Sequence, residues 1–509
     1  MMLTTFMTVL TSSVANIALP HIAGGLSVST HEVSWVLTSY LVAASIMLAA
    51  TGWLSSFIGR KRFLAISVTM FILSSALCGM AQSLPQLILG RILQGLSGGS
   101  LMPLAQAIML ESFPREKRAA AMSLFGVGVI VAPIIGPIIG GWITDNYSWR
   151  WIFYINVPVG IIGLIMQEMV LEDPPYLKRN TAAKVDYAGL VLMAVGLSAF
   201  QLVIDKGQTV DWLTDVWIRV GTVVFSLALP AFAWWEVRKQ HPLMNLRLLR
   251  NRNLALGSVL YAVVGAMTMG STAIMPIFMQ QLLGYPALQS GMAMMPRGIG
   301  SMLAMIIVGK IISKLGNRLT IFLPFFGMAA TLIVFSHMNL NIGLSNVMWP
   351  LFFNGLMMSM VFVPMTTISM SNLRQSDIQQ ASGIFTLLRN IGSSVGISLM
   401  FTMQERMAQV HQTALASNIS QYGQQFIEWS AKVKGITVSP AAVYGLAYKS
   451  VVVQATLMSF TDCFRWLAYA ALLTAPFALL FRGSRHVKDL EEMEKAVTTE
   501  AAVEIEAVE

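Results

Sequence analysis

The sequence consists of long apolar runs separated by short polar loops. About 20 apolar residues cross a bilayer as an α-helix, and hydropathy together with the loop breaks indicates about 14 such runs. Charged residues make up only 11% of the 509 residues, whereas a soluble globular chain needs roughly a quarter. The sequence therefore predicts an all-α polytopic membrane protein and argues against an ordinary soluble enzyme.

The basic residues predict how the chain lies in the membrane. Most of the 33 Lys and Arg fall in alternate loops and in the C-terminal tail, and such loops are cytoplasmic by the positive-inside rule. Both termini are therefore predicted to be cytoplasmic. The net charge of +9 does not indicate nucleic-acid binding, because the basic residues are spread over short loops rather than gathered on one solvated face.

One segment recurs along the chain, which indicates an internal duplication. Residues 52–61 have the pattern Gly-x6-Gly-Arg-Lys, and residues 309–318 repeat it as Gly-x6-Gly-Asn-Arg. Two homologous six-span halves separated by two extra spans would explain the repeat, and paired halves around a central cavity are a transporter architecture. The predicted divisions are an N-terminal bundle at 1–170, two extra spans with cytoplasmic linkers at 171–253, a C-terminal bundle at 254–482 with an external loop at 404–454, and an acidic cytoplasmic tail at 483–509.

The first copy of the repeat predicts a tight cytoplasmic turn between spans two and three. Its characteristic residues are Gly52, Gly59, Arg60 and Lys61. Glycines let helices approach closely, and the basic pair can cap helix C-termini or meet a carboxylate on a neighbouring span when one face closes. We interpret the segment as a gating motif. The alternative is an ordinary positive-inside loop.

Span four contains a basic residue, Arg91, within an apolar run, followed by Gln94. A guanidinium cannot face lipid without a large cost, so Arg91 is predicted to face the interior. Its expected partners there are backbone carbonyls, Gln94 or a carboxylate. Two roles remain open for Arg91, a structural hydrogen-bond anchor and a part in coupling.

Span five combines two prolines with several glycines, a composition that would break a helix in water. In a bilayer it gives a kinked, smooth helix that packs tightly against a partner. We therefore predict close helix contacts and a conformational role for this span. The residues of the motif are Gly128, Pro133, Gly136, Pro137, Gly140 and Gly141.

Taken together, these motifs resemble those of the major facilitator superfamily. The 14 predicted spans, the Asn-Ile-Ala-Leu-Pro run that begins at Asn16 and the segment 149–160 make the chain similar to the 14-span drug:proton antiporters of the EmrB/QacA type. The resemblance implies a major facilitator fold and export by alternating access, driven by the proton gradient without a cofactor. The loop at 404–454 is similar to that of the EmrB branch, which implies a periplasmic membrane-fusion protein and an outer-membrane channel as partners.

The acidic residues depart from the family pattern. The family usually carries an Asp in span one, where this sequence has Thr11. No acid lies squarely in the middle of a predicted span, although Glu168, Asp205, Glu236 and Asp462 lie near span ends. The remaining candidates for the coupling proton are Asp145, Glu168, Asp462 and His21. The alternative is that each of them is a structural residue at the membrane interface.

Two more arginines, Arg297 and Arg389, lie within predicted spans of the second half. Cationic side chains that face a cavity without buried acids would favour anionic or weakly acidic amphiphiles as substrates. The alternative is that each guanidinium pairs with carbonyls at a helix end. Methionines such as Met267, Met275 and Met358 would give a pocket an adaptable lining, or would simply pack in the core.

The leading hypothesis is therefore a secondary exporter of amphiphilic drugs or toxic weak acids in the inner membrane. A non-transporting receptor or scaffold is the first alternative, because the usual acid of span one is missing. A membrane-embedded enzyme is the second, but the sequence has no H-E-x-x-H spacing, nucleophile elbow or P-loop. Cys78 and Cys463 lie inside apolar runs and suggest neither a metal site nor a disulfide.

Overall fold

The computed structural model describes residues 2–112, 115–171, 186–207, 214–239, 242–371, 373, 377–417, 424–434 and 440–481. Almost all of these residues are helical, as predicted. Because the bilayer core offers no water to peptide groups, apolar segments form helices that satisfy their own backbone. The acidic tail predicted at 483–509 lies outside the described residues, as does the linker 172–185.

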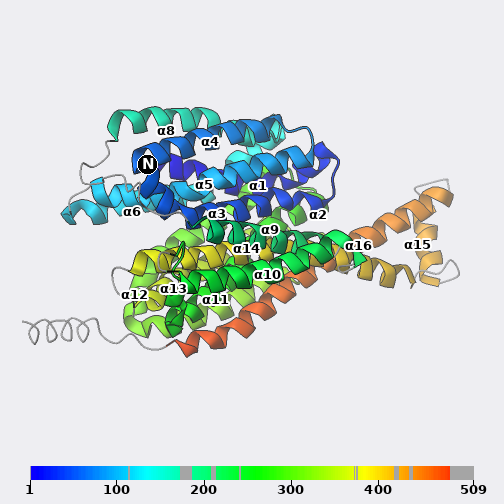
Figure 1. Cartoon of the computed structure of the whole chain (residues 1–509). Coiled ribbons are helices and arrows are strands. Elements are labelled where there is room, and N and C mark those ends of the chain that lie inside the picture. The colour runs from blue at the N-terminus through cyan, green and yellow to red at the C-terminus, as the bar shows by residue number, and fades with distance from the viewer. Residues whose placement is uncertain are drawn as a thin grey trace, which may run out of the picture.

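A first group of helices comes from the N-terminal part of the chain and lies on one side of the molecule, in blue and cyan in Figure 1. Its members are α1 (Met2–Leu26), α2 (Thr30–Val33), α3 (Trp35–Ile58), α4 (Arg60–Met80), α5 (Leu84–Ser112), α6 (Arg115–Asn146), α7 (Trp151–Tyr154) and α8 (Asn156–Val170). Within this group α1 packs against α6 and α8, and α5 packs against both α3 and α4.

A second group follows and lies on the other side of the molecule (Figure 1). Its members are η3 (Leu246–Arg250), α11 (Arg252–Ile277), η4 (Phe278–Leu282), α12 (Ala287–Phe335), α13 (Leu344–Met370), α14 (Ile378–Ser417), α15 (Gln424–Lys434), α16 (Pro440–Thr474) and η6 (Ala475–Leu480). Here α11 packs against α14, as α1 packs against α6 in the first group. The helix pairing of one group is thus repeated in the other.

Two further helices, α9 (Tyr187–Lys206) and α10 (Val216–Arg238), connect the groups in sequence. They pack against each other, and α9 also contacts α3 of the first group and α14 of the second. Asp186 caps α9 and pairs with Lys239 at 2.8 Å, which ties the start of α9 to the end of α10. The extra spans predicted at about 187–236 are therefore these two helices, and α9 contacts both groups.

The structure supports the polytopic prediction without fixing the number of spans at 14. Within the described residues, 12 helical segments are long and apolar enough to cross a membrane. The helices α5 and α6, of 29 and 32 residues, also pack in the bundle but are not among these 12. The helix α12 supplies two of the segments, because its backbone leaves the helical conformation at Gly316.

The sequence repeat is also a repeat of backbone conformation. Gly59 has φ +94° at the junction of α3 and α4, and Gly316 has φ +73° at the break in α12. A side chain at either position would be strained, because L-residues rarely adopt positive φ. Both copies of the motif therefore end in a glycine-dependent turn between two spans.

Span five packs as closely as its composition predicts. A Cβ added to Gly136 would lie 2.8 Å from the Cβ of Ser13, and one added to Gly140 would lie 2.8 Å from Cγ1 of Val14. In the second group, a Cβ on Gly392 or Gly396 would overlap backbone atoms of α11. The predicted close contact is confirmed at Gly136 and Gly140, while the surroundings of the Gly128 position lie outside the described side chains.

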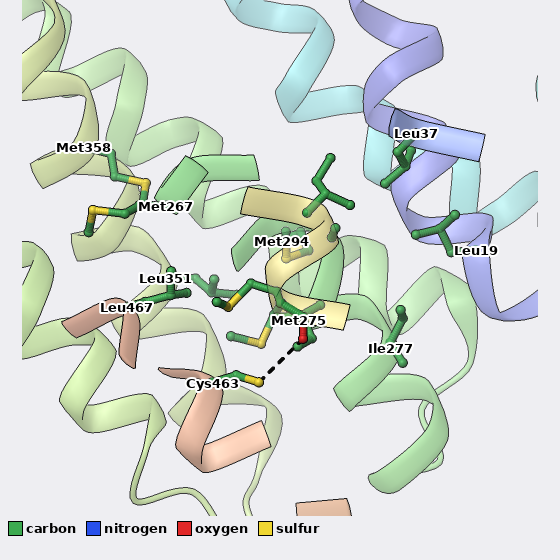
Figure 2. Close-up of a cluster of buried hydrophobic side chains, with 14 of the residues drawn as sticks. Leu19, Leu37, Met267, Met275, Ile277, Met294, Leu351, Met358, Cys463 and Leu467 are labelled. Atoms are coloured by element: carbon green, nitrogen blue, oxygen red, sulfur yellow. Dashed lines mark hydrogen bonds between the residues drawn. The ribbon is translucent and has the colours of Figure 1, made fainter. Parts of the chain in front are cut away.

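Methionines contribute to the packed interior. Figure 2 shows Met267, Met275 and Met294 in a cluster with leucine and isoleucine side chains. Cys463 lies in the same cluster, with its Sγ 3.7 Å from the carbonyl oxygen of Met400. These methionines act as core residues, in agreement with the packing alternative given above.

The segment predicted as a loop at 404–454 is largely helical. The helices α14 and α16 continue beyond the bundle, and α15 lies at the far end of the projection that they form (Figure 1). The sequence suggested a loop because Gln, Ser, Lys and Tyr replace the apolar residues there, but polar side chains do not prevent a helix in water. We call the described residues of this segment, 404–417, 424–434 and 440–454, the helical projection.

The two groups meet closely at one end of the bundle. We call the end that contains α2 the α2 end, and the opposite end the Gly59 end. A Cβ added to Gly141 of α6 would overlap the carbonyl of Ala287, and one added to Gly291 of α12 would overlap the carbonyl of Pro137. At the Gly59 end, a Cβ added to Gly52 or Gly309 would meet no neighbouring helix within 4 Å among the described residues.

The packing of α1 on α6 can be tested by enlarging Gly140. We expect Gly140→Leu to lower the free energy of unfolding by about 1–3 kcal/mol, because the added side chain overpacks the contact with Val14. Thermal unfolding in detergent measures the effect. Gly24→Leu on α1 is the matched control, because an added Cβ there meets nothing within 4 Å. Equal stability of the two variants would contradict the packing described here.

Candidate functional site

Arg91 on α5 lies in the interior, as predicted. The residue is 0% exposed, its Nε donates to the carbonyl oxygen of Val36 at 2.7 Å, and its Nη1 donates to Oε1 of Gln94 at 2.6 Å. The guanidinium also lies over the ring of Tyr40, 4.4 Å from its centre. Among the described residues Arg91 makes no ion pair, so carbonyl, amide and aromatic groups stabilise its charge.

Gln94 extends this cluster to α4. Its Nε2 donates to Oγ of Ser75 at 2.7 Å, so Arg91 and Gln94 together connect α3, α4 and α5. The next turns of α5 carry glycines, and a Cβ on Gly95 or Gly99 would overlap the backbone of α3. The cluster can therefore transmit a movement of α5 to α3, because no flexible side chain separates the two backbones.

The two candidate residues of span one, Thr11 and Asn16 on α1, are buried and uncharged. Thr11 lies where the resemblance leads one to expect an acid, and its hydroxyl lies 2.7 Å from the carbonyl oxygen of Met7 and 2.8 Å from Oδ1 of Asn156. Asn16 donates to the carbonyl oxygen of Ser12 at 3.1 Å. This part of the interior therefore carries hydrogen bonds but no negative charge from α1.

Arg297 on α12 is a second buried guanidinium. It is 8% exposed, and its Nη2 lies 3.3 Å from the carbonyl oxygen of Thr268, 3.1 Å from Oγ of Ser271 and 3.1 Å from Sδ of Met358. Its Nη1 is buried without a hydrogen-bond partner in the described structure. A buried donor on a charged group is costly to leave unpaired, so this nitrogen could bind an anionic ligand.

Arg389 on α14 contacts α11, the helix that Arg297 of α12 also contacts. Its Nη1 is 3.5 Å from the hydroxyl of Tyr261, and its guanidinium lies 5.7 Å from the centre of that ring. Tyr261 precedes Thr268 by about two helical turns. The two arginines therefore place positive charge beside α11 at two points about two turns apart.

The two peripheral acids have structural partners at opposite ends of the bundle. Asp145 is exposed, and its carboxylate accepts from the backbone N–H groups of Ala287 at 3.0 Å and Leu288 at 2.6 Å. It thus caps α12 from α6 and helps to hold the groups together. Glu168, with 53% of its side chain exposed, pairs with Lys61 at 3.4 Å. Lys61 therefore meets a carboxylate on another span, and a coupling role for either acid stays a prediction.

Sequence reasoning missed a buried acid, Asp205. Asp205 is near the end of its helix, as predicted, but it is 0% exposed. Its Oδ2 accepts from Oγ1 of Thr38 on α3 at 3.0 Å, and its Oδ1 accepts a hydrogen bond from Ser398 on α14. A position near a span end did not imply exposure, because this end of α9 is covered by helices of both groups.

A spacing pattern could have pointed to this site. Gln201 and Asp205 are four residues apart on α9, and Ser394 and Ser398 are four residues apart on α14. Residues at this spacing share one face of a helix. Gln201 Nε2 donates to Ser398 at 2.7 Å and its Oε1 accepts from Ser394 at 2.6 Å, so the two polar faces meet.

Glu236 and Asp462 also lie near span ends, but they serve other contacts. Glu236 accepts from the backbone N–H of Met244 at 2.9 Å. Asp462 pairs with Nε2 of His411 at 2.6 Å.

Comparison with known proteins agrees with this arrangement. The family model of the major facilitator superfamily matches residues 1–397. The chain is 33% identical to the fatty acid resistance protein FarB of Neisseria gonorrhoeae, over 95% of each chain. It is 35% identical to the multidrug export protein EmrB of Haemophilus influenzae over 82% of each chain, and 31% identical to that of Escherichia coli K12 over 92% of each.

Solved structures of membrane transporters share the fold. A bacterial homolog of the human lysosomal transporter Spinster, in an inward-facing and unoccupied conformation, gives a TM-score of 0.62 at 14% identity, covering 95% of this chain and 97% of that one. An auto-inhibited peptide transporter of the POT family gives 0.65 at 12% identity, with the same coverage. Helix arrangement is therefore retained where sequence similarity is low.

The Arg91 cluster is expected to be essential for transport. We expect Arg91→Ala to insert in the membrane but to lose transport, because Val36, Gln94 and Tyr40 lose their shared partner. Arg91→Lys should also transport poorly, since an ammonium cannot reproduce the planar fork of the guanidinium. Membrane abundance and substrate efflux measure the two effects. Arg406→Ala, an exposed arginine on α14, is the control, and near-normal efflux by both Arg91 variants would disprove the expectation.

Proposed function

This chain belongs to the major facilitator superfamily and, within it, to the EmrB-type multidrug export proteins, and from this premise we propose that it exports amphiphilic weak acids by proton-coupled alternating access. It is a transporter rather than an enzyme. We propose that the proton gradient supplies the energy and that no cofactor is needed. A receptor or scaffold is not favoured, because relatives aligned over most of their length are named as export proteins.

The buried Arg297 is the observation that carries the choice of substrate. Its Nη1 has no partner in the described structure, and Thr11 contributes no compensating negative charge from α1. An amphiphilic carboxylate would supply the acceptor that Nη1 lacks, and apolar walls would hold its chain. Arg389 would add to the positive potential. The name of FarB, a fatty acid resistance protein, is consistent with such a substrate.

The packing of the two groups supports alternating access. The α2 end is closed by contacts of Gly141 and Gly291 and by the cap that Asp145 provides for α12. In alternating access the Gly59 end and the α2 end open in turn, which requires the two groups to rock around a midplane site. In this proposal Gly59, Lys61 and the glycines of α6 act as gating residues. The basic loops support a cytoplasmic location for the Gly59 end and for both termini.

A second substrate class follows from the other relatives. Two of them are named multidrug export proteins, a name that does not specify anions. A neutral or cationic drug would use the aromatic and apolar walls and would not need Arg297. A binding comparison across charge types separates the two classes.

The substrate proposal predicts a charge preference that depends on Arg297. We compare a medium-chain fatty acid with the alcohol and the amine of the same chain length, binding to purified protein. We expect the acid to bind tightest, and Arg297→Ala to weaken its binding about tenfold or more, because a hydrogen bond to a charged group contributes about 1.5–3 kcal/mol. Binding of the alcohol should be unchanged.

Two controls accompany this measurement. Arg297→Lys keeps the charge and should retain part of the preference, while thermal unfolding shows whether Arg297→Ala is folded. Tighter binding of the amine, unaffected by Arg297→Ala, would contradict the proposal and favour cationic drugs.

We further propose that the helical projection binds a periplasmic membrane-fusion protein, which leads to an outer-membrane channel. The projection extends α14 and α16 beyond the α2 end, and His31 of α2 lies 3.3 Å from Thr402 at its base. It carries exposed aromatic side chains, including Tyr444 and Tyr448, which are suited to a protein contact.

Removing the end of the projection should separate transport from export to the medium. We expect a chain with residues 412–446 replaced by a short Gly-Ser linker to transport normally in proteoliposomes, since the bundle is unchanged. In cells the same variant should fail to export substrate to the medium. Deletion of the tail 484–509 is the control, and cellular export equal to that of the full chain would rule out this docking role.

A further inference from the structure

Asp205 connects all three parts of the fold. It lies on α9, one of the two extra helices, and its carboxylate accepts hydrogen bonds from Thr38 of the first group and Ser398 of the second. The residue is 0% exposed, and no described Lys or Arg forms an ion pair with it. A buried carboxylate without a cation is costly, so such residues in membrane spans are rarely structural alone.

The hydrogen bonds of this site can accommodate both protonation states. The hydroxyl of Thr38 lies 3.3 Å from the carbonyl oxygen of Ser34. The hydroxyl of Ser398 lies 3.1 Å from the carbonyl oxygen of Ser394. When Asp205 is ionised, both hydroxyls can donate to it. When Asp205 is protonated, either hydroxyl can turn to its own helix and accept the new O–H, because a hydroxyl both donates and accepts.

The other charged groups around Asp205 are few. His31 of α2 is buried nearby and bonds to Thr402, while Glu405 lies one turn beyond Thr402 with Oε2 buried and without a hydrogen-bond partner. On α14 Arg406, on α10 Arg219, on α9 Lys206 and on α2 Glu32 are exposed. The helix α3 contributes no Asp, Glu, Lys, Arg or His.

A polar track leads from Asp205 towards the middle of the bundle. Ser398, Gln201 and Ser394 form a continuous chain of hydrogen bonds, which ends at a narrow cavity between α3, α9 and α14. The polar side chains that line this cavity are Ser45, Gln201, Asn390 and Ser394.

We infer that Asp205 is a proton-binding site of the transport cycle, through which the extra helix α9 links protonation to closure of the α2 end. The inference rests on the proposed function only in requiring proton-coupled alternating access. Opening the α2 end separates α3 from α14 and brings water to Asp205, which favours the ionised form. Closing that end buries the carboxylate, which favours the protonated form. By linkage, protonation favours the closed α2 end.

Distance measurements across the α2 end test this link directly. Spin labels attached through Gln82→Cys and Asn341→Cys, both exposed, report the separation of the two groups, and both native cysteines are buried. We expect the distance distribution to shift towards the closed end as the pH is lowered. Without substrate, Asp205→Asn should favour the closed end to the same extent at all pH values, because its side chain cannot ionise. Asp205→Glu should restore the pH dependence.

Three matched variants locate the titrating group. His31→Gln and Glu405→Gln remove the other buried titratable groups near the site, and Glu32→Gln removes an exposed acid at the same end. We expect all three to keep the pH-dependent shift. An unchanged shift in Asp205→Asn, or its loss in His31→Gln or Glu405→Gln instead, would overturn the assignment.

A transport assay separates this inference from the substrate proposal. In proteoliposomes, we expect Asp205→Asn to lose transport driven by a pH gradient but to retain exchange of substrate across the membrane, which needs no net proton movement. Loss of both would indicate a structural residue and overturn the inference. If the chain carries drugs rather than weak acids, the substrate proposal fails, but the pH-dependent distances and their loss in Asp205→Asn are still expected.

Discussion

Every polar group inside the membrane must find its partner within the protein, because the bilayer core supplies none. This constraint accounts for the helical backbone and for the residues that depart from apolar composition. Arg91 donates to a carbonyl and an amide and lies over an aromatic ring. Arg297 satisfies it in part, since Nη1 has no partner in the described structure. The difference separates a guanidinium that organises its helices from one that can still bind a ligand.

Close helix contact is the second requirement for a bundle that must move, because van der Waals packing rather than hydrophobic exclusion holds membrane helices together. The glycines of α6 serve two kinds of contact. Gly136 and Gly140 hold α1 within the first group, whereas Gly141 meets the start of α12 in the second group. One helix thus belongs to a rigid unit and also closes the α2 end, where Asp145 caps α12.

The extra helices α9 and α10 add a component that two six-helix groups alone would lack. The last turn of α9 brings Asp205 between α3 and α14, two helices that contact each other across the groups. A carboxylate at this place can supply the titratable group that Thr11 does not provide on α1. Positive charge along α11 and the buried Asp205 at the α2 end then lie in different parts of the molecule, as separate sites for substrate and proton require.

The sequence by itself determined the helical membrane architecture, the interior position of Arg91 beside Gln94, and the close packing at Gly136 and Gly140. Each follows from local composition, because a charge within an apolar run must turn inward and glycine permits helix contact. Only the tertiary structure decided that Asp205 is buried, that Nη1 of Arg297 has no partner in the described structure and that the described residues of 404–454 are helical. Hydropathy describes one helix at a time, whereas burial of a polar group depends on which other helices cover it.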